Sequence, residues 1–161
     1  MKIHIFCVGG TIDKIYFDAK SKYEVGAPAI GKMLKELSIH FDYEVTSLMA
    51  KDSLEMTHSD RAQIATAVSE SACSKILITH GTDTMPETAR ALAEIEGKTV
   101  VLTGALAPAI FRDSDAMFNV GGALAAVQTK EEGTYIVMNG EVFDANNVRK
   151  DRAASRFLPL G

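Results

Sequence analysis

The sequence contains no tryptophan, only four prolines and two cysteines, and no hydrophobic run long enough to cross a membrane. Cys7 and Cys73 lie outside any CxxC or Cys/His pattern, so we expect neither a disulfide framework nor a metal site. The N-terminal segment MKIHIFCVGG has one lysine and a short apolar stretch, too brief for a signal peptide. These absences predict a soluble, cytoplasmic protein.

The sequence also lacks an excess of basic charge. Seventeen Lys and Arg residues stand against 21 Asp and Glu residues, which gives a net charge of −4. Nucleic acids and anionic membrane surfaces attract proteins that carry a surplus of positive charge. We therefore expect neither of them as a partner.

The composition present is that of a globular protein. Of 161 residues, 47% are hydrophobic and 24% are charged, which argues against a disordered chain. The length fits one domain that needs no metal or disulfide for stability. No internal repeat and no linker interrupts the sequence, so we expect a single domain over residues 1–161.

Short β-branched segments alternate with segments of helical periodicity. The predicted strands are Lys2–Val8, Tyr43–Met49, Lys75–Thr79, Thr99–Thr103 and Thr134–Met138. Apolar residues recur at helical spacing between them, over residues 30–37, 65–72, 85–93 and 120–127. This alternation predicts an α/β fold with three layers, in which helices cover both faces of a mostly parallel sheet.

Local signals refine these boundaries. Thr57 with Asp60, and Thr84 with Glu87, have the spacing of a capping box, which predicts that a helix begins at each. The segment Thr11–Pro28 has no clear periodicity and is long for a connection between a strand and a helix. Connections of this length in compact domains are commonly functional lids or else disordered.

Polar residues follow the ends of the predicted strands, where open parallel sheets bind their ligands. The polar residues, with the glycines beside them, are Gly9, Gly10 and Thr11, then Asp52, Ser53 and Glu55, then His80, Gly81, Thr82, Asp83 and Thr84, and finally Lys150. Gly-Gly-Thr after a strand is by itself most simply a tight turn, and no complete phosphate-binding motif accompanies it. His80 is read as a loop-orienting or core histidine, and Lys150 alone would be read as a solvated surface charge.

Six segments, in order, resemble the N-terminal domain of bacterial-type L-asparaginases: VGGTID, SKYEVG, KDSLEMT, HGTDTMPETA, VVLTGA and NNVRKD. HGTDTMPETA is the most specific of them. The resemblance covers residues 1 to about 157 and does not reach the C-terminal domain of that family. It implies a flavodoxin- or Rossmann-like α/β domain and a threonine-dependent amidohydrolase without a cofactor.

The resemblance also implies roles for individual residues. Thr11 matches the nucleophile and Tyr23 the lid tyrosine that polarises it. Thr82, Asp83 and Lys150 match a catalytic Thr–Asp–Lys triad. The expected substrate-binding residues are Gly10, Ser53, Glu55, Gly81 and Asp83, of which Ser53 matches a residue that binds the α-carboxylate and Asp83 one that holds the α-amino group. Backbone N–H groups near Gly10 and Thr82 are expected to stabilise an oxyanion.

The sequence departs from the family pattern at several positions. Val8 replaces a threonine, Leu54 and Glu55 replace a polar residue and an aspartate, and TGALAP lacks an arginine. Glu55 keeps the negative charge but adds a methylene group, which affects substrate identity more than reaction class. The expected substrate is L-asparagine or a similar amide.

Three functions remain as hypotheses. The first is the amidohydrolase, and the second is a non-catalytic or partner-dependent amino-acid-binding domain. The third is a nucleotide-binding α/β domain, which the missing phosphate-loop pattern disfavours. Because family members complete their active site with a C-terminal domain, we expect a homo-oligomer or a separate chain to cover the site.

Overall fold

A six-stranded sheet organises the fold, in the order β4-β1-β5-β6-β7-β8. The computed structural model describes all 161 residues. The strands of this sheet are β1 (Lys2–Gly9), β4 (Asp42–Lys51), β5 (Lys75–Thr79), β6 (Thr99–Thr103), β7 (Gly133–Met138) and β8 (Glu141–Asp144). The first five are parallel to one another, and β8 pairs antiparallel with β7. All five predicted strands and the mostly parallel sheet are confirmed.

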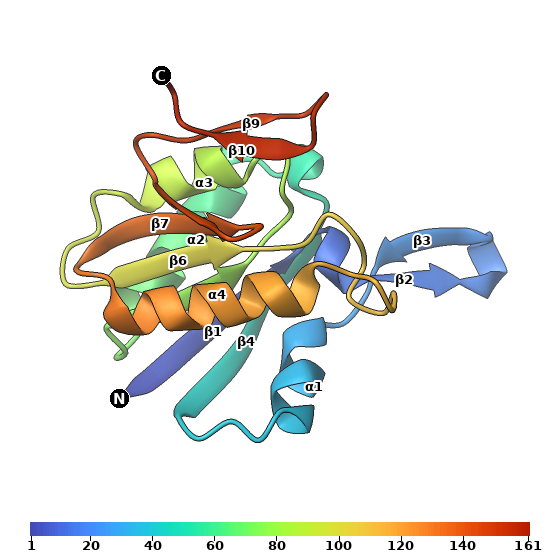
Figure 1. Ribbon diagram of the computed structural model, residues 1–161, viewed down its shortest axis with the longest axis horizontal. Helices are drawn as coiled ribbons and strands as arrows, with labels where there is room; N and C mark the ends of the chain where they lie inside the picture. The colour runs from blue at the N-terminus through green and yellow to red at the C-terminus, as the bar shows by residue number, and fades with distance from the viewer.

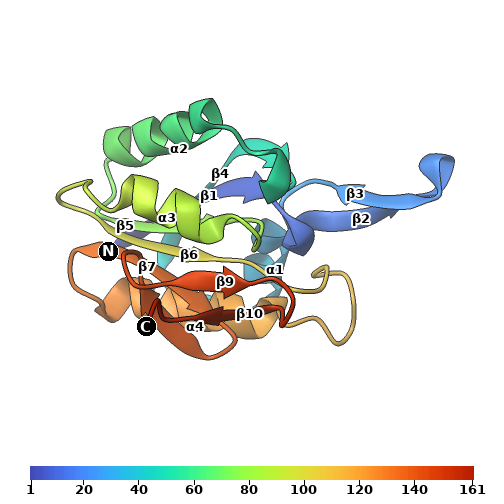
Figure 2. The same ribbon diagram turned by 90° about the horizontal axis from the view of Figure 1, so that it is seen from above.

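Four helices cover the two faces of this sheet. They are α1 (Ala29–Glu36), α2 (His58–Glu70), α3 (Met85–Leu92) and α4 (Ala116–Thr129). Helices α2 and α3 pack on one face, and α1 and α4 pack on the other (Figure 2). The predicted three-layer α/β fold is thus confirmed. None of the four helices combines the length and the apolar character that a bilayer-spanning helix requires.

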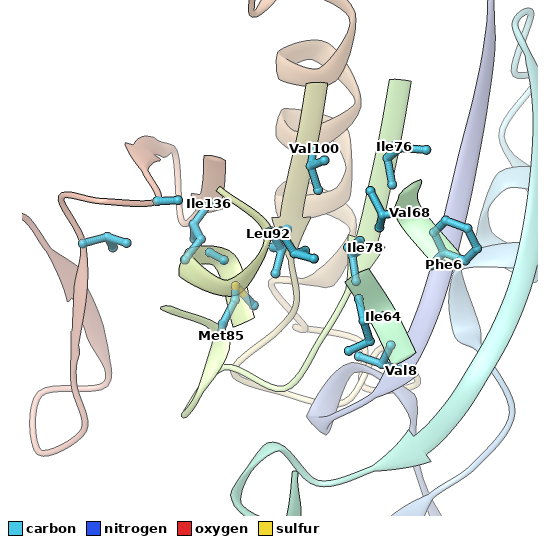
Figure 3. Packing of buried hydrophobic residues seen from close by; sticks show 14 of the residues in the cluster. Phe6, Val8, Ile64, Val68, Ile76, Ile78, Met85, Leu92, Val100 and Ile136 are labelled. Carbon is cyan, nitrogen blue, oxygen red and sulfur yellow. The ribbon is translucent and has the colours of Figure 1, made fainter. Parts of the chain in front are cut away.

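Each face of the sheet has its own hydrophobic core. On the α2–α3 face, Ile64 and Leu92 pack over Ile78 and its neighbours in the central strands (Figure 3). Strands β5 and β6 are buried on both faces, which explains their continuous runs of apolar and β-branched residues. Cys7 lies in the opposite core, where burial raises the pKa of its thiol to about 11, so it is a neutral hydrophobic side chain.

Three further strand pairs were not predicted from the sequence. The segment Thr11–Pro28 forms a hairpin of β2 (Lys14–Phe17) and β3 (Lys22–Val25), which projects from the body of the domain (Figure 1). Strand β8 follows a tight turn at Asn139 and Gly140, both of which have positive φ. A second hairpin joins β9 (Arg149–Asp151) to β10 (Arg156–Leu158). An Asn-Gly pair between two β-rich segments is the strongest short-range hairpin signal, and here it marked β8.

The two predicted capping boxes differ in outcome. At Thr57 the box is complete, because its hydroxyl accepts from the Asp60 N–H and Asp60 accepts from the Thr57 N–H. At Thr84 a helix begins as predicted, but the capping box does not form, because the hydroxyl of Thr84 donates to the carbonyl of Ser53 at 2.7 Å instead. The hydroxyl therefore ties α3 to the end of β4 rather than capping the helix.

Backbone segments approach one another very closely at the carboxyl ends of β1, β4 and β5. A Cβ atom on Gly10 would lie 2.4 Å from the backbone of Gly81, and one on Gly81 would lie 2.7 Å from the Cβ of Ser53. Gly10 also has φ +92°, a backbone conformation that residues other than glycine rarely adopt. Glycine at both positions lets the three strand ends share one small region.

This packing predicts the effect of adding a single methyl group. Gly10→Ala should lower the free energy of unfolding by about 2–5 kcal/mol, since it combines backbone strain with a steric clash. Gly31→Ala is the matched control, because a Cβ at this position in α1 meets nothing within 4 Å. It should raise stability by about 0.5–1 kcal/mol. Chemical denaturation followed by circular dichroism measures both, and a Gly10→Ala variant as stable as the wild type would contradict the packing argument.

Candidate functional site

The carboxyl edge of the sheet gathers the residues that the sequence indicated. Two short turns, Thr11–Asp13 after β1 and Ser53–Glu55 after β4, lie there with the loop between β5 and α3. Strand β8 runs antiparallel to β7 and so leads the chain away from this edge. The chain then returns to the edge through β9, which carries Lys150. Segments more than 60 residues apart in sequence therefore meet at one site.

Lys150 makes the central contacts of this site. Its Nζ donates to Thr82 Oγ1 at 2.6 Å and to Asp83 Oδ1 at 2.6 Å. The Lys150 side chain is only 7% exposed, whereas that of Asp83 is 32% exposed. The interpretation of Lys150 as a solvated surface charge is therefore wrong. A buried lysine that joins a hydroxyl and a carboxylate is arranged for exchanging protons between them.

Ser53 lies buried beside this cluster and keeps one hydrogen-bonding group free. Its Oγ accepts from the backbone N–H of Thr84 at 3.2 Å, and its carbonyl accepts from the Thr84 hydroxyl. The Ser53 side chain is 2% exposed, and its own hydroxyl proton is donated to no protein atom among these contacts. That proton is available to an anionic ligand group at the strand end.

Thr11 follows Gly10 directly and is half-buried. Because Gly10 packs against Gly81, Thr11 and Thr82 extend from two backbone segments in contact. The Thr11 hydroxyl takes part in none of the side-chain hydrogen bonds of the site. It is therefore free to meet a ligand.

The backbone N–H groups of Gly10 and Thr82 differ in their hydrogen bonding. The N–H of Gly10 donates to the carbonyl of Lys51 at 2.9 Å, so this group is already satisfied. The N–H of Thr82 donates to no backbone carbonyl, and it remains available to a developing oxyanion. The contribution of Gly10 to the site is close packing rather than a hydrogen bond.

Tyr23 and Glu55 share a second groove at this edge of the sheet. Both line a groove of about 360 Å³ between the β2–β3 hairpin and the end of β4, together with Lys14 and Asp52. Tyr23 is 47% exposed, and its aromatic neighbours are Tyr16 and Phe111 rather than groups of the cluster. Neither Tyr23 nor Glu55 takes part in the hydrogen bonds of Lys150 with Thr82 and Asp83.

His80 is a buried histidine that orients a loop, in agreement with the interpretation from the sequence. It is fully buried, its Nδ1 lies 2.6 Å from the carbonyl of Gly81, and its Nε2 lies 2.7 Å from Thr88 Oγ1. Because a carbonyl only accepts, Nδ1 carries the proton and Nε2 accepts from Thr88. Burial lowers the pKa of His80 to about 4, so the ring is neutral and holds the loop that carries Thr82.

Asp13 is a buried carboxyl group near the site that the sequence analysis did not identify. It is 3% exposed, and its Oδ1 accepts from the N–H of Ala29 at 2.9 Å, at the beginning of α1. Its carbonyl accepts from the N–H of Gly26, which closes the base of the β2–β3 hairpin. Burial raises the pKa of Asp13 to about 6, and the hydrogen bond from Ala29 only partly offsets this. The only sequence feature that could have pointed to Asp13 is its position directly after Gly-Gly-Thr-Ile at the end of a strand.

The fold and the lysine cluster define an α/β protein with a polar site at the carboxyl edge of its sheet, the usual place for ligands in such folds. No group of His, Cys, Asp and Glu side chains is arranged to hold a metal ion. The sequence profile of the family described as Asparaginase, N-terminal, matches residues 2–157. The chain belongs to this family.

Individual relatives agree with this assignment. A glutaminase-asparaginase of Pseudomonas fluorescens is 29% identical over 91% of this chain and 44% of its own length. L-asparaginase 2 of Escherichia coli is 31% identical over 92% of this chain and 46% of its own. The structure of a thermostable L-asparaginase from Thermococcus kodakarensis superposes with a TM-score of 0.85 at 25% identity, over 99% of this chain and 51% of the other. The chain thus spans about half the length of these relatives.

The buried carboxyl of Asp13 predicts a pH-dependent stability difference. Its folded pKa of about 6 exceeds the ordinary value of 3.8, so its protonated form stabilises the fold below about pH 4, and this contribution is lost as the pH rises to about 6. Asp13→Asn removes the titration and keeps an oxygen for Ala29. Relative to wild type, the variant should gain up to about 3 kcal/mol between pH 4 and pH 7 in urea denaturation.

Asp113→Asn removes the same charge from an exposed side chain and serves as the control. If the difference between wild type and Asp13→Asn is the same at both pH values, the assigned burial effect is wrong.

Proposed function

We propose that this domain is an asparaginase-like amidohydrolase that acts on a small amino-acid amide, L-asparagine or a similar compound. The observation that carries the proposal is the contact of buried Lys150 with Thr82 and Asp83, at the strand end that also holds Thr11. Burying a charged lysine costs free energy, which favours a role for Lys150 beyond packing.

In the proposed reaction, the Thr11 oxygen attacks the carbonyl carbon of the substrate amide. A bond forms between the threonine oxygen and this carbon, the carbon–nitrogen bond breaks, and ammonia leaves with the proton that the hydroxyl gives up. The cluster of Thr82, Asp83 and Lys150 relays that proton, and the free N–H of Thr82 stabilises the oxyanion. Water then hydrolyses the ester on Thr11 and releases the acid.

Substrate recognition follows from the groups left unpaired. The Ser53 hydroxyl donates to the α-carboxylate of the amino acid. Asp83 uses Oδ1 for Lys150, and its partly exposed carboxylate accepts from the α-ammonium group through the other oxygen. Opposite charges at the two ends of the substrate thus meet complementary groups, which orients the side-chain amide toward Thr11.

The second candidate function is a partner-dependent or non-catalytic amino-acid-binding domain. The projecting hairpin and the 47% exposed Tyr23 favour it, since Tyr23 takes no part in the hydrogen bonds of the cluster that it would assist. Exposed apolar side chains on the segment between β6 and α4, namely Leu106 and Phe111, indicate a surface that a partner covers. We propose a second copy or a separate chain as this partner. We also propose that the protein is located in the cytoplasm.

Hydrolysis is tested by ammonia release with asparagine, glutamine and related amides. Thr11→Ala, Thr82→Ala and Lys150→Met should each lower kcat/KM by about a thousandfold or more, since the groups act as one unit. Thr11→Ser should keep measurable activity because it retains a hydroxyl. Thr129→Ala, at an exposed position at the end of α4, is the matched control and should match the wild type.

The same experiment separates the two candidate functions. If no amide is hydrolysed and calorimetry still detects binding of aspartate or asparagine, the amino-acid-binding domain is the correct assignment. Activity that survives Thr11→Ala within about tenfold would refute Thr11 as the nucleophile.

Assembly is tested by light scattering under the assay conditions. We expect a mass of at least two chains, or activity that requires an added partner chain, because the apolar segment between β6 and α4 is exposed in one chain. Phe111→Ser should shift the mass toward the monomer. A strictly monomeric species with full activity would contradict the proposed partner.

A further inference from the structure

A second hollow lies outside the site described above. It is a groove of about 440 Å³ between α1 and the segment that leads from β6 into α4. Its apolar lining includes Ile12, Ile15, Met33, Ala109, Ile110 and Met117. None of the residues assigned to amide binding lines it. Its volume and apolar walls are those of a site for a small organic molecule.

One carboxylate is set into these apolar walls. Asp13 lines the groove and is 3% exposed. Its Oδ1 accepts from the N–H of Ala29, and no protein group donates to Oδ2. The only fully enclosed polar side-chain atom without a partner in the protein is Thr79 Oγ1, so Asp13 Oδ2 must reach solvent. The groove is the hollow through which it does so.

The other charged groups of the groove are already paired. Lys14 of β2 lies 3.4 Å from Asp52, and Lys32 of α1 lies 3.8 Å from Glu36. The segment between β6 and α4 contributes only apolar side chains to the groove. Asp13 is therefore the one charged side chain of the groove that has no counter-ion, and its burial without one raises its pKa to about 6.

We propose that this groove binds a small molecule with an apolar body and an ammonium group, in which the ammonium pairs with Asp13. The apolar walls bury the body of the ligand, and the cation supplies the missing counter-ion. A neutral ligand leaves the carboxylate unpaired, and an anionic ligand is repelled by it. This assignment does not rest on the proposed amide hydrolysis, and it stands or falls with its own binding measurement.

Phenethylamine is a suitable probe, measured by titration calorimetry at about pH 7.5, where Asp13 is ionised. We expect it to bind at least about tenfold more tightly than 2-phenylethanol or 3-phenylpropionate, which keep the apolar body and change the charge. Binding should weaken about tenfold at pH 5, where only about a tenth of Asp13 is ionised. Amide NMR signals of Ala29 and Ala109 should shift with the amine.

Two variants test the carboxylate and the groove separately. Asp13→Asn should weaken amine binding by about tenfold or more and abolish its pH dependence. Ile110→Lys changes a side chain that is 57% exposed, so it leaves folding intact, and it should weaken binding through like-charge repulsion. Equal affinity of wild type and Asp13→Asn, equal affinity for the amine and the alcohol, or no binding of the amine at millimolar concentration would each overturn the proposal.

Discussion

The contact of Lys150 with Thr82 and Asp83 is the interaction on which the site depends. It joins the last hairpin of the chain to the loop after β5, across 68 residues of sequence. Because the Lys150 ammonium is nearly buried, it requires both acceptors, and this requirement fixes the position of β9 over the carboxyl edge. The glycine contacts beneath it, between Gly10 and Gly81, bring the remaining groups within the same small region.

Most of the fold could be predicted from the sequence because its core obeys simple periodicities. The buried strands β5 and β6 have continuous β-branched runs, and the helices show apolar faces at helical spacing. The two hairpins were harder, since β2, β3 and β9 are three or four residues long and pack few side chains into the core. The Asn139–Gly140 pair is typical of a hairpin turn and indicates a strand after it, but the prediction of five strands did not include β8.

The site shows where local patterns stop being sufficient. Thr84 and Glu87 have the spacing of a capping box, but a tertiary hydrogen bond to Ser53 takes the Thr84 hydroxyl instead. Residue spacing also gave no indication that Lys150 would be buried, and only the family resemblance placed it beside Asp83. Asp13 was missed because its unusual property, the burial of a carboxyl between the Thr11 turn and α1, arises only from the fold.

The domain therefore has a completed inner cluster and an open outer side. Thr82, Asp83, Lys150 and Ser53 are held by hydrogen bonds within one chain, whereas the hairpin that carries Tyr23 projects from it.

The most direct test of the proposed chemistry is a crystal structure with bound L-aspartate, the product of asparagine hydrolysis. We predict the α-carboxylate at Ser53, the α-ammonium at Asp83 and the side-chain carboxyl beside Thr11. Aspartate bound away from Thr11, or none bound at saturating concentration, would contradict the account.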